Sequence, residues 1–204
     1  MQDDIERVLI SRQTIALRVE ALAQQITRDL INPTATGEDD AGITLVPLLT
    51  GSFIFAADLI RHLPVKLKIR LLSVSSYPGT ATSSRGAQIK DDLSHLPASL
   101  AGQHVLVIDD ILDSGNTLSL VGQTLSKMNP ASLRTCVLLR KQRPEAMAFA
   151  VDYVAFDIPD EFVVGYGLDF NDHYRNLPEI VTLRADVIAA AIASEKQAKA
   201  APTP

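Results

Sequence analysis

The sequence predicts an α/β fold in which a mostly parallel, twisted sheet is flanked by helices. Three observations lead to this prediction. Apolar, strand-like runs alternate along the chain with segments of helical periodicity, 47% of the 204 residues are hydrophobic, and neither an internal repeat nor an interdomain linker interrupts the pattern. We therefore expect a single domain over residues 1–204, large enough to bury a sizeable core.

The first half of the chain begins with apolar side chains at roughly helical spacing. Residues 3–31 predict one or two amphipathic helices, within an N-terminal helical segment of about residues 1–35. The apolar run "ITLVPLLTG" ends at Gly51, and "SFIFAADLIRHL" predicts a helix with Ser52 as its N-cap. The alternating stretch "VKLKIRLLSV" predicts a strand. Residues 75–86 are rich in Ser, Thr, Gly and Pro, which is typical of either a disordered insert or a functional lid.

The second half of the chain continues the alternation of strands and helices. "HVLVID" predicts a buried strand, "NTLSLVGQTLSKM" a helix, and "SLRTCVLLR" and "VDYVAFDI" two further strands. Residues 159–183 follow as an irregular segment that contains aromatic residues and glycines. The stretch "ADVIAAAIASEKQAKA" predicts the last helix.

Composition limits the classes of partner and the compartment. The net charge of -5 argues against a general nucleic-acid binder, and no apolar run approaches the length of a membrane span. The beginning "MQDDIERVLI" lacks the basic and apolar regions of a signal peptide. Cys136 is the only cysteine and lies in a predicted buried strand, so we expect a core residue and a reducing compartment. A cytoplasmic protein that binds neither membranes nor nucleic acid is expected.

Three carboxylates stand at the end of the predicted strand in "HVLVIDDILDSGNTL", with no Lys or Arg among them. Asp109, Asp110 and Asp113 repel one another unless a cation or a hydroxyl-rich ligand lies between them. Because ligands bind beyond the carboxyl ends of parallel strands, this is the expected place for a site. Asp109 and Asp110 can accept hydrogen bonds from sugar hydroxyls beside Mg²⁺, and Asp113 can exchange a proton with a reacting group.

The small turn after Asp113 has the composition of a phosphate-binding loop. It leads into a predicted helix, whose N-terminus favours anions, and Gly115 permits conformations that direct several N–H groups at one ligand. The hydroxyls of this turn can donate further hydrogen bonds. An ordinary capped turn is the alternative interpretation. The residues concerned are Ser114, Gly115, Asn116 and Thr117.

These motifs resemble those of a known family. "VLVIDDILDSGNTL" is similar to the phosphoribosyl-pyrophosphate motif of the type I phosphoribosyltransferases. "IPDEFVVGYGLDFNDHYRNLPEI" resembles the C-terminal hood of their hypoxanthine-guanine branch, "VPLLTGSFIFAADLIRHL" its first substrate loop, and "SSYPGTATSS" its mobile lid. The resemblance implies a type I phosphoribosyltransferase fold with a small irregular hood over residues 159–183. Two positions depart from the family pattern, which often has Lys in place of Thr50 and Glu in place of Asp109.

The resemblance also implies a role for each matching residue. Asp113 would be catalytic, handling the proton at N7 of the purine, while the acidic pair and the turn after it would hold the ribose and the 5′-phosphate. Lys141, Phe162 and Val163 would bind the base, and Leu49, Thr50, Gly51 and Arg175 the pyrophosphate. Ser76 and Tyr77 would close the lid, and Asp109, Asp110 and Asp169 would be the ligands of Mg²⁺.

The implied reaction is purine salvage. The 5-phosphoribosyl group passes from phosphoribosyl pyrophosphate to hypoxanthine or guanine, which gives IMP or GMP and pyrophosphate. The family implies a Mg²⁺ cofactor and a homodimer or homotetramer. Two alternatives stay open at this point, a xanthine-preferring 6-oxopurine transferase and a regulator of the same fold that senses nucleotides and binds RNA.

Overall fold

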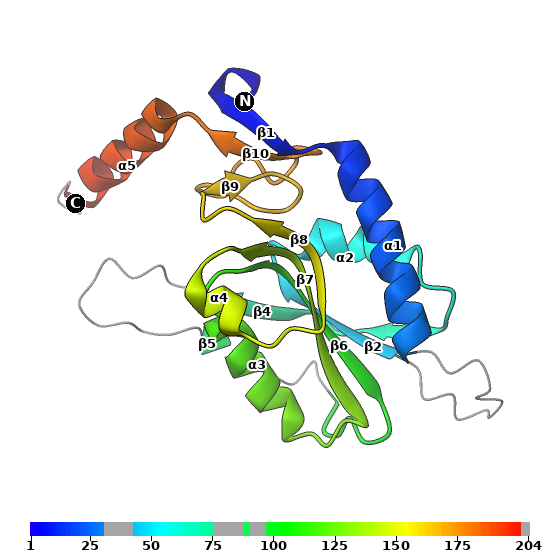
Figure 1. Cartoon of the computed structure of the whole chain (residues 1–204). Coiled ribbons are helices and arrows are strands. Elements are labelled where there is room, and N and C mark those ends of the chain that lie inside the picture. The colour runs from blue at the N-terminus through cyan, green and yellow to red at the C-terminus, as the bar shows by residue number, and fades with distance from the viewer. Residues whose placement is uncertain (31–42, 76–87, 90–96, 201–204) are drawn as a thin grey trace.

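The computed structural model describes residues 1–30, 43–75, 88–89 and 97–200 of the chain (Figure 1). The larger of two sheets has seven strands in the described residues, with the order β5-β4-β2-β6-β7-β8 and with β3 paired to β2. All pairs are parallel except β4 with β5. The mostly parallel sheet that the sequence predicts is therefore confirmed. Its strands are β2 (Ile43–Leu49), β3 (Leu67–Ile69), β4 (Leu72–Ser75), β5 (Gln88–Ile89), β6 (His104–Leu112), β7 (Ser132–Lys141) and β8 (Tyr153–Ile158).

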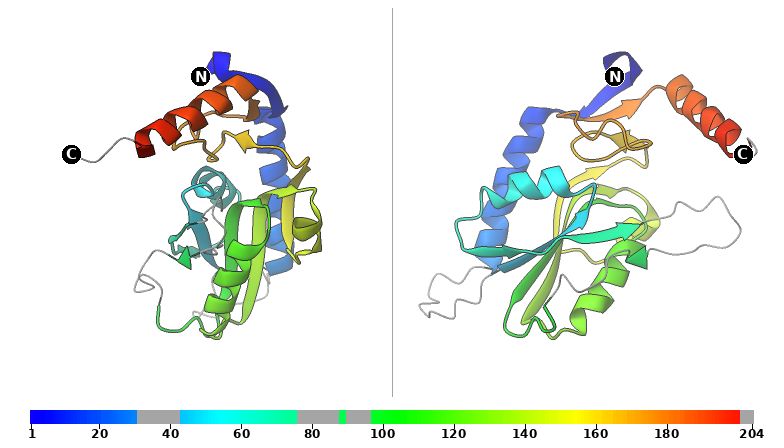
Figure 2. Two further views of the ribbon diagram at one scale, coloured as in Figure 1. Left: turned by 90° about the vertical axis from the view of Figure 1, so that its left-hand side faces the viewer. Right: turned by 180° about the vertical axis from the view of Figure 1, so that it is seen from behind.

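Helices cover both faces of this sheet, and alternate residues of the central strand β6 supply the two cores (Figure 2). Leu106 and Ile108 pack with α1 (Arg12–Leu30) and α2 (Phe53–Ile60). Val105 and Val107 pack with α3 (Asn116–Ser126) and α4 (Pro144–Ala148). Because side chains alternate along a strand, a strand buried on both faces must be apolar at successive positions, as "VLVI" is.

A second sheet, separate from the first, forms the hood. It is antiparallel, with the order β1-β10-β9, and consists of β1 (Ile5–Ile10), β10 (Ile180–Leu183) and β9 (Val163–Val164). The prediction of helix from residue 3 onward is therefore wrong for residues 5–10, since a short 3₁₀ turn, η1 (Gln2–Asp4), leads into β1 instead. The pairing partner of β1 lies at the far end of the chain, so local spacing gives no sign of it. Residues 159–183 are correspondingly less irregular than predicted.

Three local expectations also need correction. The predicted strand "VKLKIRLLSV" is two short strands, β3 and β4, each parallel to β2. The Ser52 side chain does not cap α2, because its hydroxyl donates backward to the carbonyl of Leu48 at 2.6 Å. The short helix α4 was not predicted. Cys136, in contrast, is buried as expected, and burial raises the pKa of its thiol.

The two ends of the chain frame the hood. The backbone N–H of Arg184 donates to the carbonyl of Asp4 at 2.9 Å, and the Tyr174 hydroxyl donates to the Asp4 carboxylate at 3.0 Å. The predicted last helix is present as α5 (Ala185–Ala200), which extends away from the rest of the molecule (Figures 1 and 2). No helix in the described ranges is long and apolar enough to span a membrane.

Helix α1 should stabilise the fold through its buried face alone. Leu22 is 0% exposed in the core between α1 and the sheet, whereas Leu17, five residues earlier on the same helix, is 70% exposed. We expect Leu22→Ala to lower the free energy of unfolding by about 2–5 kcal/mol, because the lost side chain leaves a cavity. Leu17→Ala should change it by less than about 0.5 kcal/mol. Urea titration of both variants checks this, and equal effects would contradict the burial.

Candidate active site

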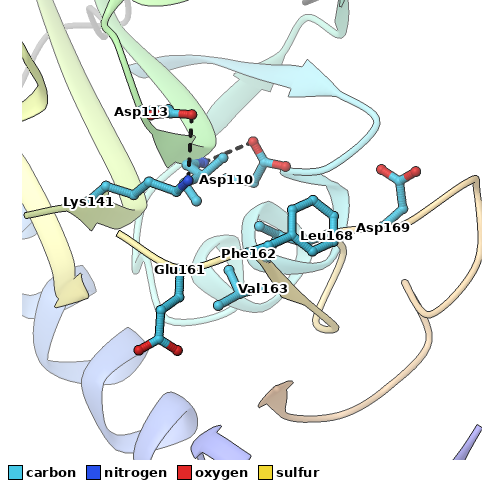
Figure 3. A pocket seen from close by; sticks show the side chains of 9 residues that line it. Asp110, Asp113, Lys141, Glu161, Phe162, Val163, Leu168 and Asp169 are labelled. Carbon is cyan, nitrogen blue, oxygen red and sulfur yellow. Dashed lines mark hydrogen bonds and ion pairs between the residues drawn. The ribbon is translucent and has the colours of Figure 1, made fainter. Parts of the chain in front are cut away.

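A pocket of about 210 Å³ lies where the carboxyl ends of the parallel strands meet the hood (Figure 3). Its acidic residues come from the end of β6 and from the hood, and its lysine from the end of β7. Six of the predicted site residues line it, together with three that were not predicted. The lining residues are Asp110, Ile111, Asp113, Lys141, Glu161, Phe162, Val163, Leu168 and Asp169.

The acidic pair at the end of β6 is held by its own backbone. Asp109 Oδ1 accepts from the N–H of Asp110 at 3.0 Å, and Asp110 Oδ1 accepts from the N–H of Ile111 at 2.9 Å. Burial, reinforced by the neighbouring Asp110 carboxyl, raises the pKa of Asp109 well above its usual range, and burial also raises that of Asp110. Asp109 is buried and Asp110 half-buried, so it is Asp110 that faces the pocket.

The loop after β2, Leu49 to Gly51, passes directly against the acidic pair. The peptide bond between Leu49 and Thr50 is cis, and Thr50 is exposed. An ideal Cβ on Gly51 would lie 1.6 Å from Asp110 Oδ2, so only glycine fits between this loop and the carboxylate. On the hood side, an ideal Cβ on Gly167 would lie 2.1 Å from the carbonyl oxygen of Gly51. Two glycines therefore let the loop, the acidic pair and the hood approach one another at backbone distance.

Asp113 and Lys141 lie next to each other at the edge of the pocket (Figure 3). Lys141 Nζ lies 3.6 Å from Asp113 Oδ2 and 3.1 Å from Asp160 Oδ1, which follows β8. The Lys141 side chain is 14% exposed, whereas that of Asp113, which Arg143 also contacts, is 46% exposed. A proton acceptor and a cationic donor thus stand side by side at the edge of one pocket.

The predicted phosphate loop joins Asp113 to α3. Gly115 is the N-cap of α3 and has φ 79°, in the left-handed region that favours glycine. An ideal Cβ there would lie 2.4 Å from the ring of Phe149, which covers the loop from behind. The side chains of Ser114 and Asn116 are exposed at the start of the helix. This arrangement of a left-handed glycine, exposed polar side chains and a helix N-terminus suits an anion.

The hood supplies an aromatic wall. Phe162 is 48% exposed, and its ring meets that of Phe170 edge to face with centroids 5.4 Å apart. A large apolar ring with so much exposed surface suits a planar ligand stacked on its free face. Val163 follows on β9 with its side chain buried, so its backbone is what the pocket can use.

Asp169 and Arg175 form an ion pair in the hood. Arg175 Nη2 lies 2.9 Å from Asp169 Oδ1 and 3.2 Å from Asp172 Oδ1, and its Nη1 donates to the carbonyl of Gly167 at 2.8 Å. Asp169 Oδ2 accepts from the N–H of Asp172 at 2.9 Å. Arg175 also favours the charged form of Asp110, so it lies within electrostatic reach of the acidic pair. Arg175 is therefore held by two carboxylates and one backbone carbonyl of the hood.

Sequence reasoning missed several residues of this site. Ile111, Glu161 and Leu168 line the pocket and lie inside quoted motifs, so their place in those motifs was the available signal. Tyr166 has φ 50° between two left-handed glycines, and its hydroxyl donates to Asp58 of α2 at 2.6 Å. Arg143, which pairs with Asp113, gave no signal beyond its nearness to Lys141. The predicted lid residues Ser76 and Tyr77 lie outside the described residues.

The acidic residues fit a divalent cation that is shared with a substrate. No cluster of three or more potential metal-binding side chains occurs in the described residues. Mg²⁺, however, usually takes one or two carboxylates and completes its shell with water and phosphate oxygens. Asp169 and Asp110 both line the pocket and offer such oxygens, while Asp109 is buried behind them.

Comparison with known proteins shows the class of the chain. The family model described as the phosphoribosyl transferase domain matches residues 9–171, so the chain belongs to the phosphoribosyltransferase family. Among curated relatives, hypoxanthine-guanine phosphoribosyltransferase from Mycobacterium tuberculosis is 42% identical over 88% of this chain and 87% of its own. Hypoxanthine phosphoribosyltransferase from Escherichia coli is 40% identical over 85% and 92%. Within the family, the chain falls in the hypoxanthine-guanine branch.

Solved structures agree with this placement. A hypoxanthine-guanine phosphoribosyltransferase from Bacillus anthracis superposes with a TM-score of 0.75 at 37% identity, covering 88% of this chain and 99% of its own. A hypoxanthine phosphoribosyltransferase from Trypanosoma cruzi, carrying a K68R mutation and bound to the product IMP, gives a TM-score of 0.79 at 36% identity, covering 93% and 95%. The fold predicted from the sequence is therefore confirmed.

A side chain at Gly51 should disrupt the acidic pair. We expect Gly51→Ala to lower the free energy of unfolding by more than about 1 kcal/mol, because its Cβ collides with the Asp110 carboxylate. Gly122, inside α3, has no atom within 4 Å of an ideal Cβ, so Gly122→Ala should raise stability by about 0.5–1 kcal/mol. Chemical denaturation distinguishes the two, and equal stabilities would contradict the close approach.

The raised pKa of Asp109 predicts a pH dependence of stability. Its stabilising contribution is full below the ordinary carboxyl pKa of 3.8 and is lost as the pH rises through the higher folded-state value. Asp109→Asn mimics the neutral form, so its free energy of unfolding should fall less than that of the wild type as the pH rises above the ordinary carboxyl pKa. Asp157→Asn, at an exposed acid paired with Arg140, is the control. Parallel curves for wild type and Asp109→Asn would contradict the prediction.

Proposed function

We propose that this protein transfers the 5-phosphoribosyl group from phosphoribosyl pyrophosphate to hypoxanthine or guanine, forming IMP or GMP and pyrophosphate in purine salvage. The observation that carries the proposal is the meeting of Asp113, Lys141 and Phe162 at one pocket beside a phosphate-type loop. Relatives named for this activity at 40–42% identity, and the structural neighbour bound to IMP, support it.

Lys141 and Asp113 divide the recognition of the base between them. The Lys141 ammonium is a donor only, so it suits a 6-oxo oxygen and is left unpaired by a 6-amino group. A site built around such a donor can reject adenine by orders of magnitude. Phe162 stacks on the purine, and the backbone of Val163 meets its exocyclic edge. This division favours 6-oxopurines over adenine and leaves hypoxanthine and guanine as the proposed substrates.

Proton transfer accompanies the exchange of bonds at the ribose. The lone pair of N9 forms the new bond to the ribose carbon as the bond to the pyrophosphate oxygen breaks and its electron pair leaves with pyrophosphate. The N7–H bond then breaks, and Asp113 takes the proton while its electrons stay on the ring. General-base assistance of this kind contributes typically ~10²–10⁴ in rate.

The remaining site residues hold the charged groups. The 5′-phosphate sits on the loop from Ser114 to Thr117, at the N-terminus of α3. Pyrophosphate meets the backbone of the Leu49–Gly51 loop and the guanidinium of Arg175. Asp169 and Asp110 would hold a Mg²⁺ ion, which would supply charge neutralisation for the leaving group. Asp109 lies behind Asp110 and helps to position it by accepting a hydrogen bond from its backbone N–H.

The assembly and its location belong to the same proposal. Phe53 is an exposed aromatic residue of α2, which supports a homodimer or homotetramer that uses this helix. Residues 1–204 act as one domain, because Val163 and Tyr166 of the hood share a core cluster with Phe55 and Leu59 of α2. The single, buried Cys136 is in keeping with a reducing, cytoplasmic location.

Turnover of four bases tests the function. Purified protein with phosphoribosyl pyrophosphate and Mg²⁺ should convert hypoxanthine or guanine rapidly and adenine not measurably. Asp113→Asn should lower kcat by about 10²–10⁴, because the variant cannot accept the proton. Dominant use of xanthine would shift the proposal to a xanthine-preferring transferase. Nucleotide binding without any turnover would contradict the proposed activity.

A further inference from the structure

We propose that Arg143 is a positioning residue for Asp113, an inference that rests on the proposed function. Arg143 Nη1 donates to Asp113 Oδ1 at 2.5 Å, the shortest approach of any cation to that carboxylate in the described residues. The arginine is not among the residues that line the pocket, whereas Asp113 and Lys141 are. It therefore reaches the carboxylate from outside the ligand space.

This contact belongs to a series of five side chains of alternating charge. Glu145 Oε2 lies 3.3 Å from Arg143 Nε, and beyond Asp113 the series continues through Lys141 to Asp160. These residues come from the loop after β6, the end of β7, α4 and the loop after β8. Glu145 thus contacts Nε of the Arg143 guanidinium, while Nη1 of the same guanidinium contacts Asp113. The alternating series, Glu145, Arg143, Asp113, Lys141 and Asp160, fixes a carboxylate that stands on an exposed turn.

The backbone fixes the direction from which the arginine approaches. The N–H of Arg143 donates to the carbonyl of Lys141 at 2.9 Å, and that of Gln142 to the carbonyl of Ile158 at 2.8 Å. Arg143 is extended, with φ -128° and ψ 152°, and is the N-cap of α4, whose first residue is Pro144. Both cations therefore extend from one short turn whose backbone is held by hydrogen bonds. Lys141 lies in the pocket, and Arg143 approaches Asp113 from outside it.

The two carboxylate oxygens of Asp113 therefore have different roles. Oδ1 is occupied by Arg143, and Oδ2 faces Lys141 and the pocket (Figure 3). When Lys141 turns to a 6-oxo group, its ammonium is shared with that oxygen and with Asp160, 3.1 Å away, and compensates the charge of Asp113 less. Arg143 then remains as its counter-charge and keeps Oδ2 directed at the base. A displacement of about 1 Å at a reacting group can cost ~10² in rate.

Arg143→Ala should therefore lower kcat by about tenfold or more, with a smaller change in the KM for the base. Millimolar guanidinium should restore part of the kcat that Arg143→Ala loses. The kcat of Arg143→Lys should lie between those of Arg143→Ala and the wild type. Arg140→Ala is the matched control, because Arg140 of β7 pairs with Asp157 away from the pocket. It should keep the wild-type kcat and show no response to guanidinium.

A double-mutant cycle separates positioning from direct contact with substrate. If Arg143 acts through Asp113, Arg143→Ala should cost less than about twofold in the Asp113→Asn background. Additive losses would overturn the inference, as would an unchanged kcat in Arg143→Ala. Thermal unfolding of every variant shows whether a loss of kcat reflects only a loss of folded protein. If folded Arg143→Ala loses kcat and guanidinium does not restore it, the result counts against positioning. A wild type that turns over no base would overturn the proposed function, and this inference with it.

Discussion

The ammonium of Lys141 joins three strand ends, and the arrangement of the site depends on it. It stands at the end of β7, between Asp113 after β6 and Asp160 after β8. Parallel strands bring their carboxyl ends to one edge of a sheet, so acidic residues there repel one another unless a cation is placed among them. With 14% of its side chain exposed, Lys141 is sheltered enough for the attraction to be weakly screened by solvent. It is also exposed enough to exchange one carboxylate for a ligand.

The second constraint is steric and involves backbone rather than charge. Gly51 passes so close to Asp110 that any side chain would collide with the carboxylate, and a side chain on Gly167 would collide with the backbone of Gly51. Three segments far apart in sequence therefore meet without side chains between them. This packing buries Asp109 and half-buries Asp110, and burial raises the pKa of both carboxyls. The molecule keeps a destabilising acidic pair at the place where a sugar or a cation can use it.

The hood is positioned by contacts with the first part of the chain. Strand β1 pairs with β10, and β10 pairs with β9, which carries Val163 beside Phe162. Tyr166 reaches from the hood to Asp58 of α2, so the helix that follows the first substrate loop is tied to the aromatic wall. The turn around Tyr166 is left-handed at three successive residues and is held by hydrogen bonds to Arg175 and Leu177. The hood is thereby held in place against α2.

The sequence by itself determined the alternation of strands and helices, the buried strand that ends in Asp109 and Asp110, and the loop from Asp113 to Thr117. These features are local, because side-chain period and turn composition depend on neighbouring residues. It also pointed to Lys141, Phe162 and Asp169, but only through resemblance to a family. The tertiary structure alone decided that residues 5–10 form a strand and that Arg143 meets Asp113. Each of these depends on a partner that the chain brings near only when it folds, so no local pattern carries it.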